Sequence, residues 1–315
     1  MMDYSAYNGF FEGKTALVTG GAGFIGSHLT QHLAALRCKV RVLDDFSTGR
    51  ASNLLNIDAE SIEGSILDDN LLQEVSDGCD FVFHLAAFVS VPKSIEEPQE
   101  CYNTNILGTE KVVQAANDAK CRRLVFTSSA ACYGSHPKLP SSERDQVSLE
   151  SPYAESKFAG EQLVAKISAI DGVSLRYFNV FGQRQDPNSQ YAAVVSAFKN
   201  AIQQNRSPII YGDGTQTRDF TAVENVVHAN LLAAYHPEPL CGAVFNVGMG
   251  FAMSLNTLVR TMANDEDVQV TYHRARNGDV QHSQADIGAI SDVLGYSPVV
   301  DTVPALRLLL NPAEL

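Results

Sequence analysis

A tyrosine and a lysine four residues apart, Tyr153 and Lys157, form the pair of side chains in this sequence best suited to acid–base chemistry. Residues at this spacing share one face of a helix, and Ser151 followed by Pro152 is typical of an N-cap and a first helical residue. An ammonium group beside a phenol favours the phenolate and lowers a pKa that is normally about 10. We therefore expect Tyr153 to act as a general acid or base, assisted by Lys157.

A glycine-rich segment upstream makes a chance surface pair the less favoured interpretation. Residues 20–26 read Gly-Gly-Ala-Gly-Phe-Ile-Gly, between an apolar run at 15–19 and a helical pattern at about 27–36. Glycines there permit a tight turn and close approach to a pyrophosphate, whose charge a helix N-terminus favours. Asp44 follows Gly26 by 18 residues, where a carboxylate can bind both adenosine ribose hydroxyls and repel a 2′-phosphate. The segment predicts a dinucleotide site that prefers NAD to NADP.

The elements that must position these residues alternate along the first half of the chain. Runs of strand length lie at 15–19, 40–43, 81–85, 124–128 and 173–178, and further helical patterns lie at about 105–119 and from 152 onward. This alternation predicts an α/β fold with a doubly wound parallel sheet of the Rossmann type, which binds ligands at the carboxyl ends of its strands. After residue 181, apolar periodicity at 191–202, 223–235 and 255–262 predicts a smaller C-terminal α/β domain interleaved with the sheet. We expect a cofactor-binding domain over residues 1–180 and a substrate-binding domain over 181–315.

Composition narrows the class of protein. The 315 residues carry a net charge of −13, which argues against a nucleic-acid or anionic-membrane surface. No apolar run approaches the roughly 18 residues of a membrane span, and the N-terminal residues lack the apolar block of a signal peptide. The six cysteines form no C-x-x-C pair and the eight histidines no H-E-x-x-H motif. We expect reduced cysteines, no metal and a cytoplasmic location.

Polar and charged residues elsewhere are candidates for substrate contacts. Ser128 and Ser129 end a strand, where a hydroxyl can relay a proton or bond a substrate oxygen. Arg218 and Arg276 can recognise phosphate in a bidentate manner, and Asn179 follows another strand. A polar strand end, a surface ion pair or a turn residue is the alternative for each of them taken alone.

Together these residues resemble the extended short-chain dehydrogenase/reductase family, specifically its UDP-sugar 4-epimerases, from about residue 14 to residue 296. Residues 43–49, 176–182 and 184–188 are most similar to UDP-N-acetylglucosamine 4-epimerases, and residues 212–214 and 218–220 match as well. The resemblance implies NAD-dependent inversion at C4 of a UDP-hexose by transient oxidation to a 4-keto sugar. It implies UDP-GlcNAc/UDP-GalNAc as substrates, UDP-Glc/UDP-Gal as further candidates, a UDP-sugar-binding C-terminal domain and a homodimer.

The resemblance also implies roles for individual residues. Ser129, Tyr153 and Lys157 are the implied catalytic residues. The residues implied in NAD binding, besides Tyr153 and Lys157, are Gly20, Gly23, Phe24, Ile25, Gly26, Asp44, Asp45, Ser47, Thr48, Gly49, Ser65, Ile66, Leu85, Ala86, Ala87 and Asn105. The residues implied in binding the UDP-sugar are Ser90, Ser128, Ser129, Asn179, Arg218, Arg276, Asp279 and Ser283.

Four positions bear on specificity. Ser65 stands where the family often has an aspartate on the adenine, and Asp45 where many relatives have asparagine. Val89 stands where close relatives often have glycine, which narrows the sugar pocket. Ser283 stands where a bulky tyrosine would restrict the pocket to unacetylated hexoses. Because Ser283 is small, we expect N-acetylated substrates to be accepted.

Three other functions share parts of this pattern. A nucleotide-sugar 4,6-dehydratase would carry an Asp-Glu pair where this chain has Ser129 and Ala130. A UDP-glucuronate 4-epimerase would need a group that recognises the C6 carboxylate. A non-enzymatic NAD-binding scaffold would use the fold alone, but such proteins commonly lack the tyrosine or the lysine that this chain retains.

Overall fold

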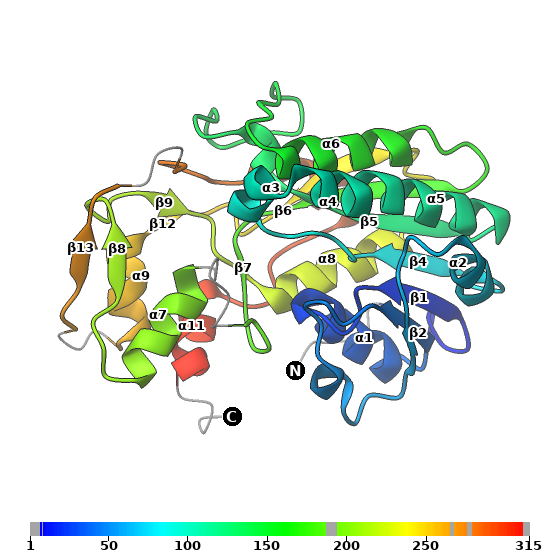
Figure 1. The fold of residues 1–315 in the computed structure, drawn as a ribbon, viewed down its shortest axis with the longest axis horizontal. Helices are drawn as coiled ribbons and strands as arrows, with labels where there is room; N and C mark the ends of the chain where they lie inside the picture. Colours follow the sequence, from blue (N-terminus) through cyan, green and yellow to red (C-terminus); the bar gives the residue numbers. More distant parts are fainter. Residues whose placement is uncertain (1–6, 8, 187–193, 265–267, 276–278, 311–315) are drawn as a thin grey trace.

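Seven parallel strands form the central sheet of the computed structural model, which describes residues 7, 9–186, 194–264, 268–275 and 279–310 (Figure 1). Every neighbouring pair in this sheet is parallel, which confirms the predicted doubly wound α/β fold. The strand order is β11 (Ala243–Val247), β6 (Asp171–Tyr177), β5 (Arg123–Ser129), β4 (Phe81–His84), β1 (Thr15–Thr19), β2 (Lys39–Asp44) and β3 (Glu60–Glu63).

Helices cover both faces of the sheet, so its central strands are buried on both sides. Successive strand residues point to opposite faces: Val18 packs with Leu29 and Val226 in one core cluster, and Leu17 packs with Val112 in the other. The first cluster joins the sheet to α1 (Phe24–Ala35) and α8 (Val223–Tyr235). The second joins it to α2 (Asp69–Ser76), α5 (Gly108–Asp118) and α6 (Pro152–Ala165).

Short helical segments precede or follow several strands. They are η2 (Ala51–Leu54), α3 (Val91–Glu96), α4 (Pro98–Tyr102), the π-helical turn η3 (Asn103–Leu107) and η4 (Ala130–Tyr133). Because α4, η3 and α5 run on without a break, the predicted helix at 105–119 begins within a π-helical turn. Such turns are frequent at functional sites.

A smaller lobe lies beside the large body and consists of residues from the second half of the chain (Figure 1). Its core packs Phe198, Ile210, Phe220, Leu258 and Leu306 together. It contains helices α7 (Val194–Gln203), α9 (Leu255–Met262) and α11 (Thr302–Leu310) and the strand pairs β7 (Val180–Phe181) with β10 (Thr221–Ala222), β8 (Ile209–Tyr211) with β13 (Thr271–His273), and β9 (Thr217–Arg218) with β12 (Met253–Ser254).

The second half of the chain returns to the large body through α8 and β11. Helix α8 packs beneath the sheet, and β11 pairs with β6, followed later by α10 (Gly288–Leu294). The described residues after Val180 are therefore shared between the lobe and the sheet. Among the helices that the structure describes, none has the length and apolar character needed to cross a membrane.

Candidate active site

The glycine-rich turn between β1 and α1 gives the backbone room for a dinucleotide. Gly20 has φ of +70°, and a Cβ there would lie 2.7 Å from the amide nitrogen of Ala86. A Cβ on Gly26 would lie 2.1 Å from the Gly20 carbonyl oxygen. Gly23 is the N-cap of α1 and supplies no capping side chain, so the first-turn N–H groups can receive an anion. Phe24 and Ile25 are partly exposed on that turn, and these features fit a bound pyrophosphate.

Asp44 lies at the carboxyl end of β2, beside this turn. Its carboxylate accepts hydrogen bonds from the backbone N–H groups of Ala22, at 2.8 Å, and Phe46, at 2.9 Å. Burial raises the pKa of Asp44, while these bonds act in the opposite direction. A Cβ on Gly49 would lie 2.6 Å from Asp44 Oδ1, so the loop after β2 closes tightly on the carboxylate. The structure therefore places Asp44 against the glycine-rich turn, as a ribose-binding role requires.

The other residues predicted near the adenosine occupy two loops. Asp45 is exposed and accepts hydrogen bonds from the backbone and side chain of Ser47, near exposed Thr48. The Ser65 hydroxyl accepts a hydrogen bond from Leu67 N at 3.1 Å. The Ile66 side chain is buried in the core, so a contact with the cofactor would come from its backbone.

The loop after β4 and the π-helical turn are joined by Asn105. This buried amide accepts from Phe88 N at 2.7 Å and donates to Phe88 O at 3.0 Å and Ser156 Oγ at 2.9 Å. It thereby fixes the loop that carries Leu85, Ala86 and Ala87, which were predicted to line the nicotinamide side, against α6. Asn105 is buried and bonds the loop backbone and Ser156, so we expect it to stabilise the loop that lines the cofactor site.

The three residues predicted to be catalytic come together where β5 ends against α6. The helix begins as predicted, with the Ser151 hydroxyl accepting from Ala154 N at 3.2 Å. Lys157 Nζ donates to the Thr127 carbonyl oxygen at 2.9 Å and lies 5.9 Å from the centroid of the Tyr153 ring. The Ser129 hydroxyl accepts a hydrogen bond from Ala131 N at 3.1 Å, and its side chain is near enough to Tyr153 to act on the pKa of the phenol.

The pKa of Tyr153 differs from the sequence-based expectation. Burial raises the pKa of Tyr153 to about 12, and the Ser129 side chain offsets only part of this rise. Burial also lowers the pKa of Lys157 to about 8. The expectation that Lys157 lowers the pKa of Tyr153 is therefore wrong for the protein chain by itself. The physical reason is that desolvation dominates, while the ammonium donates to a backbone carbonyl.

A second group of predicted residues surrounds a cavity of about 270 Å³ in the smaller lobe. Asn179, Arg218 and Asp279 line this cavity together with apolar side chains of α7. Arg218 donates to Asp279 Oδ1 at 2.7 Å, so an arginine and its counter-charge face the space where a UDP group was predicted. Arg276 lies outside the residues that the structure describes.

Asp219 connects this cavity to the segment that carries Ser283. Its buried carboxylate accepts hydrogen bonds from Met249 N at 2.8 Å and from Gly250 N and Ala285 N, both at 3.1 Å. Burial raises the pKa of Asp219 to about 6. Ser283 is itself buried, and its backbone N–H donates to the Thr217 carbonyl oxygen at 3.1 Å. Ser283 is therefore held against Thr217, the residue that precedes Arg218 in β9.

Of the remaining residues predicted near the sugar, Val89 is at the surface and Ser128 is in the interior. Ser90 is the N-cap of α3 and accepts from Lys93 N at 3.2 Å, and Val89 before it is 63% exposed. Ser128 is buried, and its hydroxyl donates to Glu161 in the interior. Its predicted contact with the sugar stays a prediction, while its observed contact lies within the protein.

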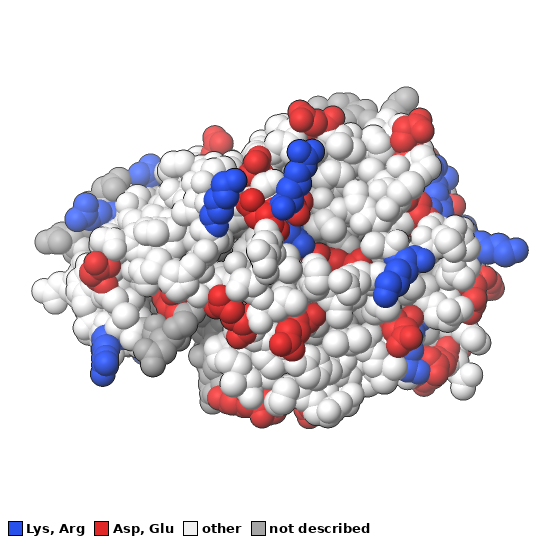
Figure 2. Space-filling view, turned by 90° about the horizontal axis from the view of Figure 1, so that it is seen from above, with Lys and Arg blue, Asp and Glu red and all other residues white. Residues whose placement is uncertain are grey.

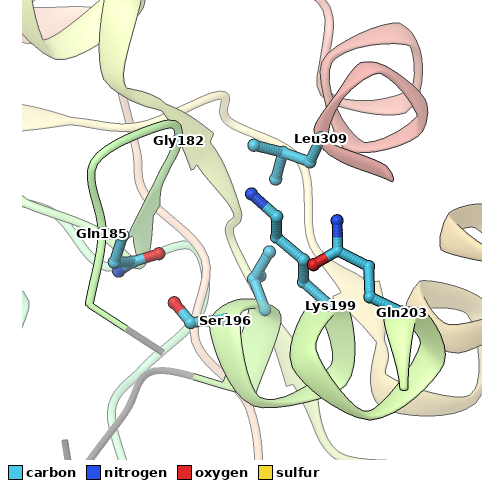
Figure 3. A pocket seen from close by; sticks show the side chains of 7 residues that line it. Gly182, Gln185, Ser196, Lys199, Gln203 and Leu309 are labelled. Atoms are coloured by element: carbon cyan, nitrogen blue, oxygen red, sulfur yellow. The ribbon is translucent and has the colours of Figure 1, made fainter. Parts of the chain in front are cut away.

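Residues of helix α7 line both the larger cavity and a second one of about 140 Å³, which Figure 3 shows. Lys199 and Gln203 extend into it from α7, Leu309 reaches it from α11, and Gln185 lies opposite (Figure 3). On the face in Figure 2, Lys and Arg side chains lie singly among acidic ones. Among the described residues, no cluster of three or more His, Cys, Asp or Glu side chains could hold a metal ion.

Comparison with known proteins agrees with this geometry. Residues 16–248 match the NAD dependent epimerase/dehydratase family. The chain is 37% identical over 297 residues to the UDP-glucose 4-epimerase of Mycolicibacterium smegmatis, covering 90% of this chain and 93% of that protein.

Two solved structures share the fold over nearly their whole length. One is the UDP-N-acetylglucosamine 4-epimerase from Methanobrevibacter ruminantium M1 in complex with UDP-N-acetylmuramic acid, with a TM-score of 0.90, 37% identity and coverage of 96% of this chain and 100% of that chain. The other is the UDP-glucose 4-epimerase from Thermotoga maritima with UDP-glucose, with a TM-score of 0.88, 33% identity and coverage of 95% and 98%. These similarities confirm the predicted family and NAD as its cofactor: the chain belongs to the NAD dependent epimerase/dehydratase family.

Proposed function

We propose that this protein inverts the configuration at C4 of a UDP-hexose, using tightly bound NAD that is regenerated in each cycle. The observation that carries the proposal is that Ser129, Tyr153 and Lys157 lie together at the carboxyl edge of the sheet that also carries the glycine-rich turn. The family relatives named 4-epimerases support the same reaction.

Different residues of the chain would act in proton transfer, in cofactor binding and in substrate binding. Tyr153 removes the proton from O4 of the sugar as C4 loses hydride, and Ser129 orients the hydroxyl through its own hydrogen bond. When bound, NAD would supply the hydride acceptor and donor that the inversion at C4 needs. With NAD bound, the Lys157 ammonium would offset part of the cost that burial places on the phenolate form of Tyr153. The residues that would hold NAD are those of the glycine-rich turn, Asp44 and the loop after β4, while Arg218 and Asn179 would hold the UDP group.

We propose UDP-GlcNAc and UDP-GalNAc as the substrate pair, with UDP-Glc and UDP-Gal also accepted. The small Ser283 side chain leaves room for an N-acetyl group, and the M. ruminantium relative was solved with an N-acetylated UDP-sugar. Ala130, the first residue of η4, provides no carboxyl group of the kind a dehydratase needs. Incubation with each of the four sugars, followed by chromatographic separation of the products, tests the pair. Epimerisation of UDP-Glc alone would contradict it.

Replacing Asp44 with Ala should weaken NAD binding by roughly 10- to 100-fold, because charged hydrogen bonds contribute about 1.5–3 kcal/mol. The same change should narrow the preference for NAD over NADP, since the carboxylate that repels the 2′-phosphate is lost. NAD content after purification and the two Kd values measure both effects. Asp77→Ala, at an exposed site beyond α2, is the matched control. Wild-type protein that binds NADP as tightly as NAD would overturn the role of Asp44.

We further propose a homodimer and a cytoplasmic location. Val91, Ile95 and Leu107 are 38%, 63% and 43% exposed on α3 and the π-helical turn, and burial of such side chains favours association. All six cysteines are free thiols, five of them buried, which suits a reducing compartment. A monomer in light scattering at micromolar concentration would contradict the dimer.

A further inference from the structure

Helix α6 presents a third polar side chain, Glu161, on the face that carries Tyr153 and Lys157. The three residues follow one another at intervals of four, so they share one stripe of the helix. The contact of this stripe with β5 is close: a Cβ on Gly160 would lie 2.3 Å from Phe126 Cζ. Lys157 Nζ lies 5.2 Å from the centroid of the same Phe126 ring. The helix and the strand are therefore in direct contact along the whole stripe.

Three polar side chains face this stripe from neighbouring strands, and we name them the polar row: Ser128 on β5, Arg176 on β6 and Asn246 on β11. Ser128 is directly paired with Arg176, and Arg176 with Asn246, in the parallel register of the sheet. All three are at most 3% exposed. Laterally paired residues point to the same face of a sheet, so the row crosses three strands near their carboxyl ends.

Glu161 connects the helix to this row. Its Oε1 atom accepts hydrogen bonds from Ser128 Oγ and, at 2.8 Å, from Arg176 Nε, and its Oε2 atom accepts from Arg176 Nη2 at 2.7 Å. Both side chains of the ion pair are only 4% exposed. Burial by itself lowers the pKa of Arg176, but hydrogen bonding and charge pairing with Glu161 raise it overall. The geometry is the bidentate one that arginine and carboxylate prefer.

The far end of the row reaches the segment that carries Ser283. The Arg176 guanidinium lies 4.8 Å from the centroid of the Tyr133 ring, and the Tyr133 hydroxyl donates to Asn246 Oδ1 at 2.7 Å. Asn246 Nδ2 donates to the carbonyl oxygens of Ser141, at 2.8 Å, and Asp286, at 3.2 Å. Ser141 is in turn bridged to Ala285. A continuous chain of contacts thus runs from α6 to the residues that follow Ser283.

A buried ion pair is weak evidence for stability, because the cost of removing both charges from water can exceed their attraction. Its geometric consequence is larger here. An α-helix rises 1.5 Å per residue, so Glu161 lies about 12 Å along a rigid rod from Tyr153. A shift of α6 at Glu161 is transmitted directly to the catalytic end of the helix.

We infer that Glu161 is a positioning residue, which uses the polar row to hold the catalytic helix α6 in register with β5 and with the segment that carries Ser283. This inference rests on the proposed catalytic role of Tyr153 and Lys157. Glu161 touches no reacting atom; it acts by fixing where Tyr153 meets Ser129 and the sugar.

The test compares two buried ion pairs at opposite ends of β6: Glu161–Arg176 joins α6 to the carboxyl end of β6, and Arg123–Asp171 joins β5 to its amino end. Arg123 on β5 is directly paired with Asp171 on β6, and their side chains form an ion pair at 2.5 Å that is 3% and 14% exposed. Glu161→Gln removes the charge at the carboxyl end, and Asp171→Asn removes it at the amino end. Single-turnover epimerisation, with NAD-loaded enzyme in excess over the sugar and well above its Kd, gives a rate constant that does not depend on the fraction of folded protein.

We expect both variants to lower Tm, but only Glu161→Gln to lower the single-turnover rate constant, by about 10- to 100-fold, as a small misplacement of catalytic groups can. Ser128→Ala removes one hydrogen bond to Glu161 and keeps the ion pair, so it should lower the rate constant less. This variant replaces Glu161→Gln in the test if Glu161→Gln does not fold. The inference would be overturned if Glu161→Gln and Ser128→Ala both reacted with the wild-type rate constant. It would also be overturned if Asp171→Asn lost as much of the rate constant as Glu161→Gln. Tyr153→Phe separates the two proposals: substantial activity in that variant would reject the catalytic assignment itself.

Discussion

Replacing Tyr153 with Phe should lower turnover by roughly 10²- to 10⁴-fold, the usual contribution of a positioned acid or base. The variant loses only the phenolic hydroxyl, which lies near Ser129 and takes the O4 proton in the proposed reaction. Its ring can still pack beneath Lys157, at the 5.9 Å separation seen here. We therefore expect the fold, the Tm and the NAD content to stay close to those of the wild-type protein.

The matched control for this variant is Tyr102→Phe. The Tyr102 hydroxyl also contacts α6, donating to Glu155 Oε2 at 2.5 Å, but it lies outside the proposed catalytic cluster. Its loss should leave turnover within about threefold of wild type, because surface substitutions away from a functional site usually have small effects. Near wild-type turnover in Tyr153→Phe, or an equal loss in both variants, would reject the role of Tyr153.

Replacing Ser283 with Tyr should change which substrates the protein accepts. Ser283 is 9% exposed and its backbone is held to Thr217 at 3.1 Å, so a larger side chain cannot move away without breaking the pairing next to Arg218. The added ring should occupy the space for the C2 substituent. We expect kcat/KM to fall by roughly 100-fold for UDP-GalNAc and by only a few-fold for UDP-Gal, because steric exclusion acts on the larger group.

A tyrosine introduced elsewhere in the same region controls for nonspecific effects of the new ring. Asp292→Tyr places it on the exposed surface of α10, where both substrates should react as with the wild-type protein. Equal losses on UDP-GalNAc and UDP-Gal in Ser283→Tyr would show that Ser283 does not determine the size of the C2 group.

The sequence predicted those elements whose apolar pattern is strong and bounded by glycine or polar residues. The strand at 15–19 and the helices at 223–235 and 255–262 have the predicted bounds. Helix α1 begins three residues earlier than predicted, at Phe24, because Gly23 already provides its extended N-cap. The edge strand β3 was not predicted, since its sequence Glu-Ser-Ile-Glu offers one apolar residue. Strand β11 was not predicted, although the predicted helix at 223–235 directly precedes it.

The candidate site was predictable where local spacing carries the chemistry, and not where the sheet register does. Tyr153, Lys157 and the glycine-rich turn are recognisable from a few adjacent residues. Glu161 was overlooked, although its spacing from Lys157 repeats that of Lys157 from Tyr153. Arg176 and Asn246 resemble isolated polar residues in apolar strands until the pairing of β5, β6 and β11 brings them together. The pKa of Tyr153 depends on burial, which spacing alone does not reveal.

The most direct test of the central claim is to incubate the purified protein with UDP-GlcNAc or UDP-Glc, without added NAD, and to resolve the product sugars. We expect each substrate to become an equilibrium mixture with its C4 epimer, because the cofactor stays bound and is regenerated. The mixture of UDP-GlcNAc and UDP-GalNAc should have the same composition from either starting sugar, and so should the mixture of UDP-Glc and UDP-Gal. Absence of a C4 epimer from both substrates in NAD-loaded protein, or accumulation of a dehydrated keto sugar instead, would contradict the proposed function.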